Sequence, residues 1–231
     1  MNEVIAVIPA RAESEKIPRK HTLQLNGKPL ITWTIEAAIE SGVFDEVVVN
    51  TNCQDIAHIA RQSGAKVPFI RPPYLAKDDT PTIEVLNHTL EWYRTKQVFF
   101  SDVVMLQPTS PLRDKTVISE AWDLYLQSQA ESLVSICELE HPIQWTYSLS
   151  EEMELTALFK DHNKRRQEYE KNYRLNGAIY ITKSEPIREG KELFSAAKSV
   201  AYVMPKYQSI DIDDEEDFQY AEFLMSRNYY E

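Results

Sequence analysis

The stretch "EVIAVIPARAESEKIPRK" (residues 3–20) sets the fold expected for this chain of 231 residues. It begins with "EVIAVIP", a continuous apolar run that is typical of a β-strand buried on both faces. The segment "PLITWTIEAAIESG" (29–42) then has the apolar spacing of a helix, with proline near its start and glycine at its end. A loop between such a strand and such a helix is a common place for phosphate groups to bind. This loop contains no glycine, four basic residues and two glutamates, namely Arg11, Lys16, Arg19, Lys20, Glu13 and Glu15.

Strand and helix patterns continue to alternate through the first half of the chain. Short apolar or β-branched runs predict four more strands, at 46–50, 67–70, 102–106 and 132–136. Helical spacing predicts three more helices, at 55–64, behind Thr80-Pro81 and at 114–128. Repeated β-α-β units indicate an α/β fold with a mainly parallel sheet flanked by helices. Because ligands of such sheets lie beyond the carboxyl ends of the strands, the loops that follow these strands should form one rim.

The pattern changes in the second half of the chain. The segments 142–149 and 153–159 predict a hairpin, and a polar, highly charged stretch follows them. Strand character then returns at 177–181, at 200–204 and at 209–213, where the last strand enters an amphipathic helix. We therefore expect a single domain over residues 1–231, with residues 139–175 as an appendage within it.

Composition excludes several classes of protein. The formal net charge is −11, with 36 acidic and 25 basic residues, which argues against a general nucleic-acid binder. The two cysteines, Cys53 and Cys137, have neither a disulfide pattern nor metal-ligand spacing, which favours a cytoplasmic location. The sequence contains no signal-peptide pattern and no apolar run of membrane-spanning length, so we expect no membrane partner. The glycine motifs of P-loop ATPases and of dinucleotide-binding domains are also absent.

The acidic segment "IDIDD" (210–214) has the most distinctive local chemistry. Asp211 and Asp213 alternate along the predicted strand, so both side chains should leave the same face. Two carboxylates held together repel each other unless a cation lies between them, and Mg²⁺ shared with substrate phosphates is the natural occupant. The alternative is that these residues cap the following helix. Capping accounts for Asp214, but Asp211 lies too far upstream.

The rim loops and this acidic pair together predict a site for a metal-bound nucleotide and a hydroxylated partner. In this interpretation Arg11, Lys16 and Lys20 face a triphosphate, and Asp211 and Asp213 hold its metal ion. The loop "QPTSPLR" (107–113) offers an amide and two hydroxyl groups on a turn framed by prolines, which suits a polyol. Proline-rich turns are common, so this loop alone would predict little.

Seven motifs, in the same order along the chain, resemble those of one family. They are "IPAR…S…IPRK" (8–20), "NGKPLI" (26–31), "FDEVVVNT" (44–51), "RPPYLAKDDTPT" (71–82), "LQPTSPLR" (106–113), "NGAIYI" (176–181) and "SIDID" (209–213). The chain resembles the acylneuraminate cytidylyltransferases, or CMP-sialic acid synthetases, with relatives that act on pseudaminic and legionaminic acids. The resemblance implies a Rossmann-like nucleotidyltransferase (GT-A-like) fold and a homodimer. It also implies Mg²⁺-dependent transfer of CMP from CTP to the anomeric hydroxyl of a nonulosonic acid, with release of pyrophosphate.

The resemblance further implies roles for individual residues. Those expected at the nucleotide are Ala10, Arg11, Ser14, Lys16, Lys20, His21, Arg71 and Thr82. Those expected at the sugar are Gln107, Thr109, Ser110, Asn176 and Tyr180. Arg166, in the dimerisation appendage at 139–175, is expected to face the sugar carboxylate in the neighbouring subunit. The expected metal ligands are Asp211 and Asp213, and the expected catalytic set is Arg11, Lys20, Asp211 and Asp213.

Three places depart from the family pattern. Relatives usually have "GGSK" where this chain has "AESE" (12–15), and asparagine where it has His21; some have lysine where it has Gln144. Glycines let a loop bring its backbone amides to phosphate, and Ala12 and Glu13 restrict that freedom. Two alternatives therefore stay open. One is a cytidylyltransferase for another acidic sugar such as an octulosonate, and the other is a catalytically weak homologue that binds nucleotide or sugar.

Overall fold

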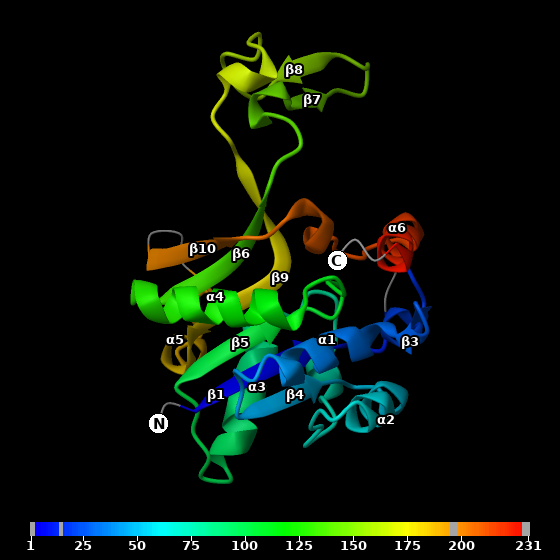
Figure 1. Cartoon of the computed structure of the whole chain (residues 1–231), viewed down its shortest axis with the longest axis vertical. Coiled ribbons are helices and arrows are strands. Elements are labelled where there is room, and N and C mark those ends of the chain that lie inside the picture. Colours follow the sequence, from blue (N-terminus) through cyan, green and yellow to red (C-terminus); the bar gives the residue numbers. More distant parts are fainter. Residues whose placement is uncertain (1–2, 14–15, 195–197, 228–231) are drawn as a thin grey trace.

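A six-stranded sheet forms the centre of the computed structural model, which describes residues 3–13, 16–194 and 198–227 (Figure 1). In spatial order its strands are β10 (Ser199–Val203), β6 (Ser132–Glu138), β9 (Tyr173–Lys183), β5 (Asp102–Leu106), β1 (Val4–Pro9) and β4 (Glu46–Asn50). Strand β9 is antiparallel to both of its neighbours, while the other five strands share one direction. The prediction of a mainly parallel sheet is confirmed.

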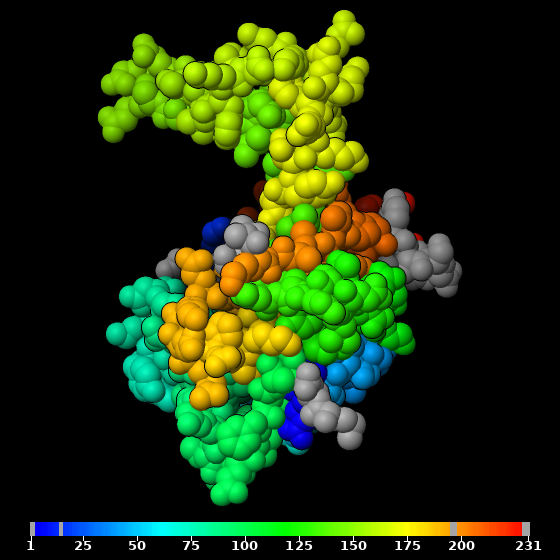
Figure 2. Space-filling model, turned by 90° about the vertical axis from the view of Figure 1, so that its left-hand side faces the viewer, coloured from blue at the N-terminus to red at the C-terminus, as the bar shows by residue number. Residues whose placement is uncertain are grey.

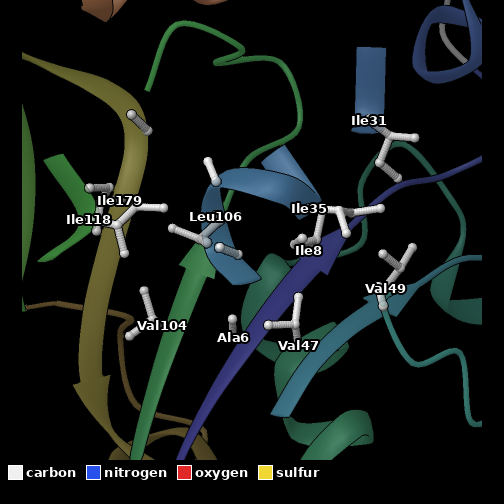
Figure 3. Close-up of a cluster of buried hydrophobic side chains, with 14 of the residues drawn as sticks. Ala6, Ile8, Ile31, Ile35, Val47, Val49, Val104, Leu106, Ile118 and Ile179 are labelled. Carbon is white, nitrogen blue, oxygen red and sulfur yellow. The ribbon is translucent and has the colours of Figure 1, made fainter. Parts of the chain in front are cut away.

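One face of the sheet is covered by the three helices α1 (Leu30–Glu40), α2 (Gln54–Gln62) and α4 (Lys115–Ser128). Every second residue of the central strands points to this layer, as Ala6 and Ile8 of β1 and Val104 and Leu106 of β5 do (Figure 3). These side chains are almost completely buried. Burial of that apolar surface is the main force that holds the helices on the sheet.

The opposite face is covered by α3 (Thr82–Arg94) and α5 (Ser184–Arg188). The remaining residues of the same strands point this way, including Ile5 and Val7 of β1 and Val103 of β5. A strand covered on both faces must be apolar throughout, which explains why the first strand lacks polar alternation.

A third apolar cluster lies beside the main sheet, where α6 (Glu215–Ser226) packs against Ile17 and Leu30. A small antiparallel ribbon borders this cluster, formed by β2 (Gln24–Leu25) and β3 (Lys28–Pro29). Asp214 caps α6, because its carboxylate accepts from the backbone N–H of Asp217 at 3.1 Å. The prediction that Asp214 is a capping residue is confirmed. The described helices are all too short or too polar to cross a lipid bilayer.

The appendage projects from the body of the molecule as a distinct lobe (Figures 1 and 2). Strands β6 and β9 continue beyond the sheet and connect to it, and the lobe itself contains the hairpin of β7 (Tyr147–Leu149) and β8 (Leu155–Ala157). The predicted hairpin is therefore confirmed. Its apolar side chains are exposed, with Met153 at 73% and Leu155 at 68% of full accessibility.

Two predicted strands are wrong. Residues 67–70 form no ladder, because the chain makes a single bridge from Lys66 to Val48 and then reaches Pro72 and Pro73, which lack backbone N–H donors. Residues 210–213 are extended but have no neighbouring strand. Their backbone is fixed instead by bonds to loops and side chains, such as the one from the N–H of Ile212 to the carbonyl of Thr109 at 2.8 Å.

Candidate active site

A cleft of about 380 Å³ opens at the carboxyl ends of β1 and β5. Nine of the residues predicted for the site line it, namely Arg11, Lys20, His21, Arg71, Thr82, Gln107, Thr109, Asp211 and Asp213. They come from segments far apart in the chain, and the fold brings them to one rim as the sheet topology predicted.

The loop after β1 is tied to the end of β4. The backbone N–H of Ala10 donates to the carbonyl of Asn50 at 3.0 Å, and that of Ala12 donates to Oδ1 of Asn52 at 2.8 Å. Ala10 itself is fully buried, so its contribution to the rim is made by its backbone. These bonds direct Arg11 into the cleft, where its guanidinium forms an ion pair with Asp78.

Lys20 is a buried cation beside the acidic pair. Its ammonium donates to the carbonyl of Ile212 at 2.7 Å and lies 3.9 Å from Oδ1 of Asp213. Burial lowers the pKa of Lys20, while the carboxylates of Asp213 and Asp211 oppose that shift. Lys20 therefore links the basic side of the cleft to its acidic side.

Arg71 is the second buried cation, and neutral groups fix its position. Its Nε donates to Oδ1 of Asn50 at 2.7 Å, and its Nη1 reaches the carbonyl of Leu75 at 3.5 Å. Burial, helped by the nearby charge of Arg11, lowers the pKa of Arg71 to about 10. Neither contact supplies a negative charge, so this cation is not neutralised by its hydrogen-bond partners.

The pKa of His21 is strongly lowered by its surroundings in the cleft. Its pKa is lowered to about 3, first by burial and then by the charges of Lys20, Arg11 and Arg71. An imidazole at this position is neutral at physiological pH, because it is buried and because three cations lie near it. A buried cluster of like charges is costly unless an anion joins it. The cleft is therefore electrostatically suited to a polyanionic ligand.

Asp211 and Asp213 face this basic cluster from the extended segment 210–213. Ile212 is fully buried between them, so the predicted alternation holds although the predicted strand does not form. Burial raises the pKa of Asp211, while a hydrogen bond with Thr109 opposes the shift. Oδ1 of Asp211 is buried and has no hydrogen-bond partner among the residues that the structure describes. A lone-pair acceptor without a donor is suited to a cation.

The side chains of Gln107 and Asp211 both lie close to Gly177 of β9. A Cβ atom on Gly177 would lie 2.6 Å from Oε1 of Gln107 and 3.3 Å from Oδ2 of Asp211. The φ angle of Gly177 is +76°, a conformation that other residues rarely adopt. Glycine is required here on both counts, and the signal in the sequence was the glycine within "NGAIYI".

The other predicted sugar residues have different surroundings. Ser110 is fully buried behind the cleft, and Asn176 is also buried, where its amide donates to Ser209 Oγ at 2.9 Å and accepts from Ser135 at 2.6 Å. Tyr180 lines an adjoining cleft of about 490 Å³, which shares Thr82 and Gln107 with the first. Burial and the charge of Asp211 raise the pKa of Tyr180.

The remaining three predicted residues are Lys16, Arg166 and Ser14, and neither of the two that the structure describes is among the lining residues. Lys16 is exposed and is not among the lining residues. Arg166 is exposed on the appendage, in a short helical turn over Arg166–Glu168. Ser14 lies outside the described residues.

Sequence reasoning missed two charged residues that shape the cleft. Arg113 is completely buried, and it donates to the carbonyls of Gln107 and Ala178 and to the hydroxyl of Thr34. It thus ties the loop after β5 to β9 and α1, and burial lowers its pKa to about 9. Asp78 pairs with Arg11 from the loop before α3. Both stand within quoted motifs, but neither has a local pattern that indicates its partner.

A mainly parallel α/β sheet with buried cations and an unpaired carboxylate at its rim defines a nucleotidyltransferase type of enzyme. A family model described as "Cytidylyltransferase" matches residues 5–228, so the chain belongs to the cytidylyltransferase family. It is 34% identical to the pseudaminic acid cytidylyltransferase of Campylobacter jejuni subsp. jejuni serotype O:2, over 97% of each chain. It is 37% identical to the CMP-N,N'-diacetyllegionaminic acid synthase of Legionella pneumophila subsp. pneumophila, again over 97% of each.

A solved structure supports the same fold. The structure of CMP:2-keto-3-deoxy-manno-octonic acid synthetase complexed with CTP superimposes with a TM-score of 0.71, covering 97% of this chain and 99% of that one. The sequence identity is 15%, so this likeness concerns the fold alone. The predicted Rossmann-like nucleotidyltransferase fold is confirmed.

Proposed function

We propose that this enzyme transfers CMP from CTP to the anomeric hydroxyl of a nonulosonic acid and releases pyrophosphate. The observation that carries the proposal is the position of three cations, Arg11, Lys20 and Arg71, opposite Asp211 and Asp213 in one cleft. A triphosphate would neutralise the cations, and a metal ion would bridge it to the carboxylates. The names of the two relatives supply the sugar class.

The residues fit a divalent ion such as Mg²⁺ that is shared with substrate phosphates. Oδ1 of Asp211 is buried with no hydrogen-bond partner in the described part of the chain, and Asp213 is more exposed beside it. Two carboxylates with phosphate oxygens and waters are a usual Mg²⁺ environment. Among the described residues no group of three or more histidine, cysteine or carboxylate side chains could hold a metal alone, which agrees with a shared ion. When bound, such an ion would neutralise charge on the phosphates during transfer.

The chain's own residues would mainly hold and orient the two substrates. Arg11 and Lys20 would bind phosphate oxygens and stabilise the charge that passes to the departing pyrophosphate. Arg71 and Thr82 also line the cleft and would surround the nucleoside. The amide of Gln107 would hold the sugar so that its anomeric hydroxyl attacks the α-phosphate in line.

A homodimer is the second part of the proposal. The appendage exposes apolar side chains, including Trp145, Tyr147, Leu149, Met153, Leu155, Leu158 and Phe159. An exposed apolar set of this size is typical of a protein interface. A concave region where the appendage meets the body is lined by aromatic residues such as Tyr173 and Tyr220. A second copy that covers this region would bring its own Arg166 toward the cleft, where a guanidinium suits a sugar carboxylate.

A direct assay tests the proposal. The purified protein is incubated with CTP and Mg²⁺ and with pseudaminic, legionaminic, N-acetylneuraminic or 2-keto-3-deoxy-octonic acid, and pyrophosphate release is measured for each. We expect release with at least one nonulosonic acid and little with the octonic acid. Preference for the octonic acid would favour the octulosonate alternative. Binding of CTP without turnover of any acid would favour the catalytically weak homologue, for which Glu13 in the cleft is the specific observation.

A further inference from the structure

Arg11 is paired within the cleft in which it is expected to bind phosphate. Its guanidinium contacts Asp78, whose carboxylate lines the same cleft. Both side chains are partly exposed, at 32% for Arg11 and 62% for Asp78. This pair differs from the buried hydrogen bonds of Arg71 to Asn50 and of Lys20 to the Ile212 carbonyl, which go to neutral oxygen atoms and hold those cations in place.

We propose that Asp78 is a positioning residue that holds the Arg11 guanidinium in the nucleotide-free enzyme. The ion pair between the two residues breaks when the triphosphate binds to Arg11. In this role Asp78 sets the affinity for CTP and for the pyrophosphate that leaves. The inference rests on the proposed function, because it takes a triphosphate as the ligand of Arg11.

The loop that carries Asp78 is anchored at both ends. On one side Leu75 is buried, and its carbonyl accepts from Arg71. On the other side α3 begins at Thr82, after a turn in which the N–H of Thr80 donates to the carbonyl of Lys77 at 3.3 Å. Asp78 therefore stands within a short turn between fixed points. It can release Arg11 by a change of its own side chain, without unfolding of the loop.

Arg11 has a negatively charged partner in both states of the enzyme. An exposed ion pair contributes little, because water and salt screen it, so a triphosphate with several charges displaces Asp78 easily. Phosphate oxygens near Arg11 also repel the Asp78 carboxylate, which moves it out of the cleft. When pyrophosphate leaves, Asp78 restores a partner to Arg11, and the cation is not left alone beside Lys20 and Arg71. Asp78 thus weakens binding of both the donor and the leaving group.

Neutralising Asp78 without changing its shape tests this role. For Asp78→Asn we expect the Kd for CTP with Mg²⁺ in calorimetry, and the inhibition constant of pyrophosphate, to fall together by about two- to fivefold. The KM for the sugar should stay at the wild-type value, because the change acts through Arg11. Asp78→Glu keeps the charge and should behave like the wild type.

Two controls separate this role from a general effect of charge. Asp79 is the adjacent carboxylate, but it does not line the cleft with Arg11, so Asp79→Asn should change the Kd for CTP by less than ~1.5-fold. In an Arg11→Ala background, Asp78→Asn should lose its effect, because a coupling between two residues vanishes when either is removed. Equal effects of Asp78→Asn and Asp79→Asn, or weaker CTP binding by Asp78→Asn, would overturn the inference while leaving the proposed function intact. Failure of the wild type to bind CTP would overturn both.

Discussion

The cleft and the appendage of this molecule differ in the kind of side chain that each buries or exposes. In the cleft, charged groups are buried in the subunit's own structure, with Arg71 at 5% and Lys20 at 9% of full accessibility. In the appendage, apolar groups such as Leu155 are exposed although they belong in an interior. In the first region several cations lie close together, and in the second apolar surface is open to solvent. The cleft is thus organised within one chain, whereas the exposed apolar surface of the appendage is the basis for the proposed homodimer.

The acidic side of the cleft gives the largest expected effect. Asp211→Asn should reduce turnover at limiting Mg²⁺ by about 100-fold or more, because it removes a charge that faces the metal. Asp213→Asn should also reduce it strongly. Steady-state rates at several Mg²⁺ concentrations measure both effects. Near-wild-type rates in both variants would eliminate the proposed metal site.

The same substitution should not destabilise the fold. Burial raises the pKa of Asp211, so the ionised carboxylate is less favourable in the folded chain than in the unfolded chain. Its contribution to the free energy of unfolding therefore decreases as the pH rises above the unfolded value near 4. Asp211→Asn should leave the free energy of unfolding at pH 7 unchanged or higher, which urea denaturation measures.

Arg166 tests whether the appendage completes the cleft of a second subunit. Arg166→Ala should raise the KM for the sugar by about tenfold or more and leave the KM for CTP nearly unchanged, because a charged hydrogen bond to the sugar carboxylate is lost. Mixing Arg166→Ala and Asp211→Asn subunits should restore partial activity, since one site of the heterodimer regains both residues. Full activity of a purified monomer would contradict this arrangement.

Removing apolar surface from the appendage should separate the subunits. Leu155→Ser should raise the dimer dissociation constant by about tenfold or more, as expected for loss of a buried leucine. Sedimentation velocity over a range of protein concentrations measures it. Leu126→Ser on α4 is the matched control, because Leu126 is also exposed, at 54%, but lies on the body of the molecule. Equal dissociation constants for the two variants would show that the appendage is not the interface.

The pH dependence of the free energy of unfolding tests the environment of His21 in the cleft. Because the folded pKa of about 3 lies below the ordinary value of 6.5, the unfolded chain binds a proton before the folded chain does. Stability contributed by neutral His21 is therefore present at pH 7 and is lost as the pH falls below about 6.5. Between pH 7 and pH 5.5 His21→Asn should lose about 1 kcal/mol less of its free energy of unfolding than the wild type. The exposed His58→Asn on α2 is the control, and an identical pH profile for it and His21→Asn would contradict the assignment.

The smallest expected effect concerns the loop that departs from the family pattern. Glu13 lines the cleft and is exposed, so Glu13→Gln should tighten CTP binding by about twofold through reduced repulsion of phosphate. Ala12→Gly separately tests loop flexibility, because it changes the backbone without changing charge. Calorimetry with CTP and Mg²⁺ compares them. Weaker binding by Glu13→Gln would mean that Glu13 supports the loop and does not hinder phosphate.

Much of this molecule was predictable because its signals are local. The apolar run at 3–9 predicts β1, the spacing in 114–128 predicts α4, and β5 forms at the residues expected, 102–106. The strand expected at 209–213 was wrong, since alternation describes which way side chains point and not whether a neighbouring strand is present. The lining of one cleft by Arg11, Lys20 and Asp213 followed from the rule that places loops at the rim of a parallel sheet.

The sequence by itself determined the layers of the fold, the family and the set of chemical groups at the rim. These depend on periodicity and short motifs, which neighbouring residues carry together. Only the tertiary structure decided which group contacts which. Lys20 donates to the carbonyl of Ile212 across 192 positions, and Arg11 pairs with Asp78 across 67. Such pairings depend on distances between distant segments, and the chain acquires those distances only when its apolar layers pack.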